Sequence, residues 1–404
     1  MPDQRQPKKR LKVAILMGGR STEREVSFMT GQRVLQALDP EKYLAVPVDA
    51  ANLGRLPGSA PPALVDGPAV ADVLAPERLA GGAAGIMAPD GDPARPDLCF
   101  IALHGRYGED GTIQGLLELL GIPYTGSGGL ASAAAMNKVM SKKLFLAEGI
   151  PTPSFSVLDR PEAREQFLTT WRAGASSVGV PCVVKPNEQG STIGITIVRR
   201  PEEMPAALDL AFKYDETVLI ERFVDGVEIT AALLGNRDPA VLPLVEIVPA
   251  GGFYDYERKY TPGATEEIVP ARISEAQAAV ARELALRCHR AFGCRGMSRV
   301  DMIVEPEQIW VIEINTIPGM TPTSLLPRAA AAAGIPFPHL VDRLIELALE
   351  RDGTGGRGDG ETGRAEGSQI TSPSVAPRGP APRCAPPPGR PVSLSVAATP
   401  GGCC

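Results

Sequence analysis

Apolar runs alternate with helix-like segments along the first part of the chain. Three short apolar runs predict buried strands at residues 12–17, 43–48 and 98–103. A helix is expected after the first run, because Thr22 precedes Glu25 at the spacing of a capping box with Thr22 as the N-cap. This order of strands and helices predicts an α/β domain with a doubly wound parallel sheet over residues 11–130.

Two further regions follow, with different patterns. In residues 131–220 a helix is expected near 136–148, and β-like runs at 182–185 and 195–198 enclose a long glycine-bearing loop, which indicates an antiparallel hairpin. Residues 221–350 close the folded part and alternate strand-like runs with helices. The runs lie at 218–221, 227–234, 241–248 and 309–314, and the helices at 274–292 and 339–349.

Two segments lack this patterning. Residues 50–97 are rich in Ala, Pro and Gly, which indicates a peripheral insertion. Residues 351–404 contain almost no large apolar side chains, so they cannot bury enough surface to offset the entropy of ordering and are predicted to form a disordered tail. Truncation after Arg351 is therefore expected to leave the melting temperature and activity nearly unchanged. A clear loss of either in the truncated protein would show that the tail docks on the rest.

The overall composition favours a protein of the reduced cytoplasm. The 404 residues suffice for two or three domains, and the net charge of -6 argues against a nucleic-acid partner. No apolar run approaches the length of a membrane span, and the polar start of the chain lacks the apolar stretch of a signal peptide. Outside the terminal pair, the seven cysteines have no metal-ligand spacing.

Two apolar runs near the end of the folded part carry the richest chemistry. Arg299 and Asp301 alternate along one run, and Glu313 and Asn315 along the next, so each pair shares a face of its strand. Two carboxylates and an amide offer the oxygen ligands that suit Mg²⁺ when it carries the phosphates of a nucleotide. Taken alone, these residues favour a simpler interpretation, an Arg–Asp ion pair and an Asn turn at a strand end.

Loops in the first domain add polar groups. Residues 104–111 follow a predicted buried strand, at the end where open α/β sheets bind ligands, and supply His104 and Glu109. The alternative is a flexible loop with a solvated histidine. Glu23, after Gly18 and Gly19, is a weaker signal because the helix dipole favours Glu in a first turn. The absence of a G-x-G-x-x-G fingerprint makes a nicotinamide site a poor prediction.

Further residues are suited to a nucleotide. Lys185 stands on a β-like segment beside a Gly-Ser loop and would clamp a phosphate, as would Lys138 at a helix start. Exposed lysines are the simpler alternative for both. Glu221 closes a strand and is suited to accept from an adenine amino group, and Ser324 begins a helix whose N–H groups would hold a carboxylate. The aromatic, charged segment 253–260 is a candidate lid.

In this order along residues 11–349, the motifs closely resemble those of the D-alanine–D-alanine ligase family, ATP-grasp enzymes of peptidoglycan synthesis. The resemblance rests on residues 18–27, 104–111, 124–128, 184–186, 253–260 and 299–324. It implies that a two-part ATP-grasp fold follows the first domain. It also implies ligation of two D-alanine molecules with ATP, through a D-alanyl phosphate. The oligomeric state stays open, with a homodimer as one option.

The resemblance implies roles for the matching residues. Glu23 would hold the ammonium of the first D-alanine, with His104 close by. Ser191 and Tyr260 would hydrogen-bond with Glu23 and fix the active-site loops. Arg299 would stabilise the acyl-phosphate and the tetrahedral species.

The remaining implied roles concern ATP, metal and the second substrate. ATP would be bound through its phosphates by Lys138, Lys185 and Lys259, through adenine by Glu221, and through ribose by Glu228. Two Mg²⁺ ions, or Mn²⁺, would be ligated by Asp301, Glu313 and Asn315. The second D-alanine would be placed by Gly319, Ser324 and Leu325.

Two alternatives remain from the sequence. A related ligase that joins D-alanine to D-lactate would share the phosphate and metal groups, but Tyr260 argues against it because relatives of that kind usually replace this tyrosine. A catalytically silent nucleotide-binding module is the non-enzyme alternative, and the intact set of Arg299, Asp301, Glu313 and Asn315 argues against it. The chain carries Thr192-Ile193 where many relatives have Ser-Val, a small departure.

Overall fold

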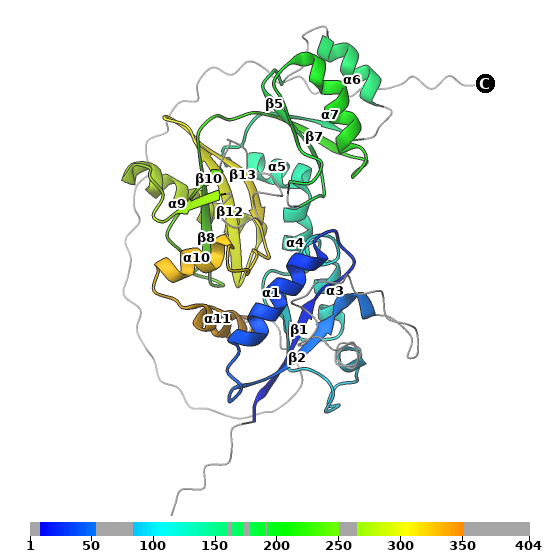
Figure 1. Cartoon of the computed structure of the whole chain (residues 1–404), viewed down its shortest axis with the longest axis vertical. Helices are drawn as coiled ribbons and strands as arrows, with labels where there is room; N and C mark the ends of the chain where they lie inside the picture. Colours follow the sequence, from blue (N-terminus) through cyan, green and yellow to red (C-terminus); the bar gives the residue numbers. More distant parts are fainter. Residues whose placement is uncertain are drawn as a thin grey trace, which may run out of the picture. The chain divides into compact units, whose positions relative to one another are not determined.

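Strand β1 (Leu11–Met17) forms the centre of the first sheet, and its side chains from Val13 to Met17 are all buried. Strands β2 and β3 pair with it in parallel, in the order β2-β1-β3. Figure 1 labels β1 and β2 of this sheet beside α1. The other elements of this region are β2 (Tyr43–Asp49), η1 (Ala50–Asn52), β3 (Leu98–Ile101), α1 (Arg24–Ala37) and α3 (Thr112–Leu119). The prediction of a parallel α/β unit is confirmed.

The start of α1 differs from the sequence prediction. Its N-cap is Glu23, which makes no side-chain capping hydrogen bond, so the prediction of Thr22 as N-cap is wrong. Instead, the Ser21 hydroxyl donates to the carbonyl of His104 at 2.7 Å and accepts from the Glu23 N–H at 3.2 Å. A tertiary contact with the loop after β3 therefore replaces the local capping box.

A second sheet has four antiparallel strands in the order β4-β7-β5-β6. The predicted hairpin is confirmed, because β5 and β6 pair with Val184 opposite Thr196. Helices α6 and α7 pack on this sheet through an apolar core. The elements are β4 (Phe155–Leu158), α6 (Ala163–Arg172), β5 (Cys182–Pro186), β6 (Thr196–Val198), η2 (Pro201–Glu203), α7 (Met204–Ala211) and β7 (Val218–Arg222).

The helix expected near 136–148 is present as α5 (Lys138–Ala147), and a further helix that was not predicted, α4 (Gly129–Met136), precedes it. Asn137 separates them in an extended conformation, and its side-chain oxygen accepts from the N–H of Met140 at 2.9 Å. This cap gives α5 its own N-terminus, with Lys138 as its first residue.

The third sheet follows the order β11-β10-β8-β12-β13, and β9 pairs with β8. Helix α9 packs on β8, β12 and β13. The run 241–248, expected as one strand, divides between β9 and β10. The elements are β8 (Val227–Leu234), β9 (Ala240–Val241), β10 (Val245–Pro249), β11 (Thr265–Ile268), α9 (Glu275–Phe292), β12 (Met297–Val304) and β13 (Ile309–Asn315).

The last two helices return to the first sheet. Helices α10 (Leu325–Ala332) and α11 (Phe337–Leu349) contribute Leu326 and Leu344 to the core that contains β1. The guanidinium of Arg33 on α1 donates to the carbonyl of Met320 at 2.8 Å. These contacts hold the turn before α10 beside the first domain.

The computed structural model describes residues 9–53, 84–159, 163–172, 178–190, 192–249 and 265–350. These residues lie within one compact unit that contains the three sheets, and the run 218–221, counted with the third region in the sequence, forms β7 of the second sheet. The domain boundaries themselves stay predictions. In the described part of the chain, no helix has both the length and the apolar character needed to cross a bilayer. Ser191, Lys259, Tyr260, the candidate lid, the tail and most of the 50–97 insertion lie outside the described residues.

Candidate active site

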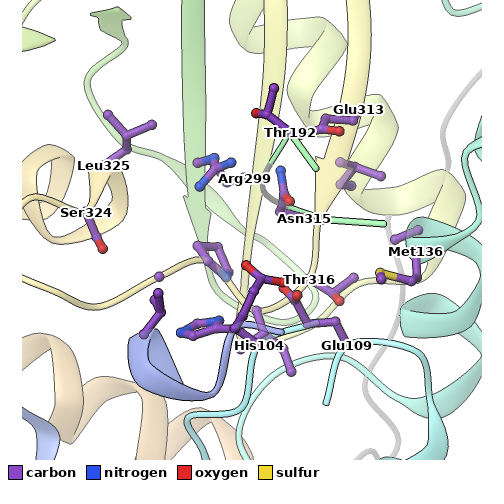
Figure 2. A pocket seen from close by; sticks show the side chains of 18 of the residues that line it. His104, Glu109, Met136, Thr192, Arg299, Glu313, Asn315, Thr316, Ser324 and Leu325 are labelled. Atoms are coloured by element: carbon purple, nitrogen blue, oxygen red, sulfur yellow. The ribbon is translucent and has the colours of Figure 1, made fainter. Parts of the chain in front are cut away.

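A pocket opens where the loops of the first domain, the ends of β12 and β13 and the start of α10 meet (Figure 2). Figure 2 shows Arg299, Glu313 and Asn315 on the strands, Ser324 and Leu325 at α10, and His104 and Glu109 on the loop after β3. The residues predicted from sequence that line it are Glu23, His104, Lys138, Arg299, Glu313, Asn315, Gly319, Ser324 and Leu325. Tertiary structure therefore gathers side chains that lie up to about three hundred residues apart in the sequence.

The four polar residues of β12 and β13 form one cluster. Strand pairing places Arg299 opposite Asn315 and Asp301 opposite Glu313, as the alternation of buried and polar residues predicts. Arg299 makes a bidentate ion pair with Asp301, from Nε to Oδ1 at 2.9 Å and from Nη2 to Oδ2 at 2.8 Å. Thr230 of β8 also donates to Asp301 Oδ1, at 2.6 Å, and Asn315 Nδ2 lies 3.2 Å from Oδ2. The Arg–Asp pair of the simpler interpretation is thus present.

The donor chemistry of this cluster fits Mg²⁺. The ion commonly takes one or two carboxylates and completes its shell with water and substrate phosphates. In residues 9–350, as far as they are described, no three His, Cys, Asp or Glu side chains gather closely enough to hold a metal by themselves. A cluster of two carboxylates and an amide suits an ion that arrives with phosphates.

Two carboxylates lie on the side of the pocket formed by the first domain. Glu23 is only 5% exposed, and its Oε2 lies so close to two glycines that a Cβ on Gly105 would approach it to 2.7 Å and one on Gly190 to 2.9 Å. Glu109 faces the same pocket and accepts from the N–H of Gly105 at 2.6 Å. Gly105 also has a φ of +70°, so the loop requires glycine there both for its backbone conformation and for this close approach.

Burial keeps two side chains of this region uncharged: it favours the protonated form of Glu109 and the neutral form of His104. Burial, and then the charge of Glu23, raise the pKa of Glu109 to about 8. Burial, helped by the charge of Arg299, lowers the pKa of His104 to about 4. His104 is buried, and its Nε2 lies 2.9 Å from the Thr30 hydroxyl. The expectation of a solvated histidine is therefore wrong, and a neutral imidazole faces the pocket.

The raised pKa of Glu109 predicts a pH-dependent stability. The folded state keeps this proton up to about pH 8, whereas the unfolded chain loses it near 4.5, so the folded state binds more protons between these values. The contribution of Glu109 to the free energy of unfolding should therefore fall as pH rises through this window. Glu109→Gln should flatten the decline, measured by urea unfolding from pH 5 to 8.5 without ATP or metal. The exposed control Glu148→Gln should follow the wild type, and equal slopes in all three proteins would contradict the assignment.

The opposite end of the pocket is built by the first turn of α10. Ser324 is the N-cap residue of α10, and its hydroxyl accepts from the N–H of Thr321 at 2.9 Å. Gly319 is required beside it, since a Cβ there would lie 2.8 Å from the Ser324 hydroxyl. The N–H groups at this helix start, near Leu325, are suited to bind a carboxylate.

A second polar group lies in the buried layer between β5, β7 and α5. Glu221 on β7 is 3% exposed and forms ion pairs with Lys185 of β5, through Oε1, and with Lys142 of α5, through Oε2 at 2.8 Å. Burial alone would raise the pKa of Glu221, but the two lysines together lower it below its ordinary value. Lys185 is therefore not the exposed hairpin lysine of the simpler interpretation.

Two other residues expected to bind the nucleotide lie outside this buried cluster. Lys138 donates to the carbonyl of Gln189 at 2.5 Å, and Glu228 lies half-buried on β8 opposite Ile303.

Sequence reasoning missed two contributors to these sites. The sequence gives no sign of a role for Thr230, because only the pairing of β8 with β12 brings it to Asp301. The burial of Lys142 could have been predicted, because Val139, Lys142 and Phe145 recur at a spacing of three on the buried face of α5. A lysine on an apolar stripe predicts a buried partner.

Family models match most of the chain. The model described as D-ala D-ala ligase N-terminus matches residues 12–127, and the model described as D-ala D-ala ligase C-terminus matches residues 144–346. The D-alanine–D-alanine ligase of Pelotomaculum thermopropionicum is 48% identical over 345 residues, which cover 85% of this chain and 98% of that protein. The enzyme of Desulforamulus reducens is 47% identical over 343 residues, which cover 84% of this chain and 99% of that protein.

Solved structures agree with this assignment. The D-alanine–D-alanine ligase of Bacillus anthracis complexed with ATP is 34% identical, with a TM-score of 0.63 over 84% of this chain and 97% of that one. The VanG D-Ala:D-Ser ligase of Enterococcus faecalis is 30% identical, with a TM-score of 0.67 over 84% of this chain and all of that one. The fold is therefore the expected one, a parallel α/β domain followed by an ATP-grasp. By its sequence and its fold, the chain belongs to the D-alanine–D-alanine ligase family of ATP-dependent ligases.

Proposed function

We propose that the pocket at the ends of β12 and β13 is the active site in which two D-alanine molecules and ATP form D-alanyl-D-alanine, ADP and phosphate. Membership of the ligase family supports the reaction, and the residues that line the pocket support its location. A carboxylate and an amine do not condense unaided in water, so the first carboxylate must acquire a leaving group. Transfer of the ATP γ-phosphoryl group to that carboxylate oxygen gives D-alanyl phosphate and ADP. ATP as co-substrate supports a cytoplasmic location and a role in peptidoglycan precursor synthesis.

The first D-alanine would bind beside the acidic loops of the first domain. An ammonium group is stabilised by a carboxylate in a region of low dielectric, and Glu23 is almost fully buried there. His104 is neutral, so it adds a hydrogen-bonding group without repelling the ammonium. This arrangement leaves the substrate carboxylate free to point towards Arg299.

Charge develops on phosphoryl and carboxyl oxygens during the reaction, and Arg299 is placed to stabilise it. Its guanidinium lines the pocket and is held in a fixed orientation by two hydrogen bonds to Asp301. Asp301, Glu313 and Asn315 would hold two Mg²⁺ ions, or Mn²⁺, which when bound neutralise phosphate charge. The residues thus divide between orienting the reactants and offsetting charge.

The second D-alanine would bind with its carboxylate at the start of α10. Backbone N–H groups there, together with the Ser324 hydroxyl, are suited to a carboxylate. The amine would then face the activated carbonyl, attack it, and displace phosphate after losing a proton. Water must be excluded at this stage because an acyl-phosphate hydrolyses. Ser191, Lys259 and Tyr260, outside the described residues, keep the closing and phosphate-binding roles implied by the family pattern.

The nucleotide would extend from this pocket towards β7. Lys138 lines the pocket, and Lys185 lies in the buried layer behind it, with its ammonium on Glu221. Glu221 Oε2 lies 2.8 Å from the Lys142 ammonium, and a carboxylate oxygen has a second lone pair that can accept another hydrogen bond. That remaining acceptor capacity would allow Glu221 to bind an adenine amino group. Glu228 would contact the ribose.

The proposal is tested by supplying ATP and Mg²⁺ with D-alanine, L-alanine, or D-alanine plus D-lactate, and measuring phosphate and products. D-Alanine alone should give one dipeptide per phosphate, and L-alanine should give little of either. D-Alanyl-D-lactate as the main product would favour the depsipeptide alternative. Nucleotide binding without phosphate release from any mixture would favour the silent binding module.

A further inference from the structure

Lys142 is a buried cation to which the proposed reaction assigns no role. It is 1% exposed, whereas the next residue, Lys143, is exposed on the same helix. Removing an ammonium group from water costs free energy unless partners compensate it. We therefore expect the buried ammonium of Lys142 to have a specific role, which its contacts indicate.

Lys142 connects the second sheet to the third. Its ammonium lies 2.8 Å from Glu221 Oε2 on β7 and donates to the Thr152 hydroxyl at 2.6 Å. Thr152 in turn donates to the carbonyl of Val311 on β13 at 2.8 Å, and the Val311 N–H donates to the carbonyl of Pro151 at 2.8 Å. Helix α5 lies between β7 and β13 in Figure 1. The chain of contacts thus ends two residues before Glu313.

Two lysines share one carboxylate, but their surroundings differ. Lys142 is held from both sides, by Glu221 and by Thr152, in the layer between the sheets. Lys185 lies on β5, which leads directly into the loop whose residues Gln189 and Gly190 line the pocket. Lys185 is therefore the lysine on the nucleotide side, and Lys142 is the one fixed within the fold.

We propose that Lys142 is a positioning residue, the permanent counter-ion of Glu221, which allows Lys185 to leave that carboxylate and bind a phosphate of ATP. The inference rests on the proposed nucleotide site. A buried carboxylate that loses its one cation is strongly destabilised, so without Lys142 the Glu221 carboxylate would retain Lys185. With Lys142 in place, the carboxylate and the phosphate each have a cation, and the link through Thr152 holds Glu221 in register with β13.

The test compares Lys142→Met, similar in length but uncharged, with the exposed control Lys143→Met. In the wild type and both variants, calorimetry measures the affinity for Mg·ADP, competition measures the affinity for adenosine, and steady-state kinetics give the Michaelis constants for ATP and D-alanine. Lys142→Met should weaken ADP binding about tenfold or more, with much less effect on adenosine and on the D-alanine constant. An equal loss for ADP and adenosine would indicate a merely distorted adenine pocket and would overturn the proposal.

A double-mutant cycle tests whether Lys142 acts through Glu221. In a Glu221→Gln background the carboxylate no longer holds Lys185, so adding Lys142→Met should change ADP affinity by less than about twofold. A full tenfold loss in that background would contradict the proposed route. If Lys142→Met does not fold, Thr152→Val provides the milder variant, because it removes one hydrogen bond of Lys142 and keeps the side-chain shape. It should weaken ADP binding about two- to tenfold and leave the D-alanine constant unchanged, and an unchanged ADP affinity would count against the proposal.

The wild-type protein separates failure of this inference from failure of the proposed function. If the wild type neither binds ADP nor forms the dipeptide, the proposed site is wrong. If the wild type does both and Lys142→Met matches Lys143→Met in ADP affinity, only the role of Lys142 is wrong.

Discussion

Glu313→Gln is expected to lower dipeptide synthesis by at least about 10²-fold while leaving the fold intact. The substitution keeps the size and shape of the side chain on β13, so the strand pairing of residue 313 with Asp301 should persist. It removes one of the two carboxylates proposed to hold Mg²⁺. The measurement is the ligation rate against Mg²⁺ concentration, together with the melting temperature.

The control for this prediction is Glu307→Gln, which removes an exposed carboxylate from the turn between β12 and β13. It should behave as the wild type in both measurements. A normal ligation rate in Glu313→Gln with unchanged Mg²⁺ dependence would remove Glu313 from the metal site.

Arg299→Ala is expected to lower turnover by about 10²-fold or more, with smaller changes in the Michaelis constants. A cation held in position contributes most where negative charge develops, which is in the transition state. In the structure two hydrogen bonds to Asp301 supply that orientation, at 2.9 and 2.8 Å. Steady-state kinetics with ATP and D-alanine varied in turn separate the two effects.

Arg299→Lys is the matched variant, because it keeps the charge but cannot reproduce the bidentate geometry with Asp301. It should recover only part of the lost turnover. If Arg299→Ala instead raised the Michaelis constants and left turnover unchanged, Arg299 would serve binding and not the transition state.

The sequence predicted those parts of the site that depend on local periodicity. Alternation along two apolar runs was enough to place Arg299 and Asp301 on one face of the first strand, and Glu313 and Asn315 on one face of the second. The pairing of the two strands confirms that these residues share a surface. Alternation is reliable here because every second residue of β12 packs into the core beneath α9.

Features that depend on tertiary contacts were predicted less well. Thr22 has the spacing of a capping residue, but Ser21 instead hydrogen-bonds to His104, 83 residues away, and that contact sets the start of α1. The burial of Lys142 required both α5 and the distant strand β7, although its place on an apolar stripe was a signal in the sequence. Local propensity is a weak guide wherever such distant partners decide the conformation.

The most direct test of the central claim follows oxygen atoms. D-Alanine labelled with ¹⁸O in both carboxylate oxygens is incubated with ATP, Mg²⁺ and the protein, and the inorganic phosphate is analysed by mass spectrometry. A D-alanyl phosphate intermediate requires one carboxylate oxygen of the first D-alanine to leave with phosphate, so one ¹⁸O per phosphate is expected for each dipeptide formed. Dipeptide formed with unlabelled phosphate would contradict activation of the carboxylate by phosphorylation, and with it this account of the pocket.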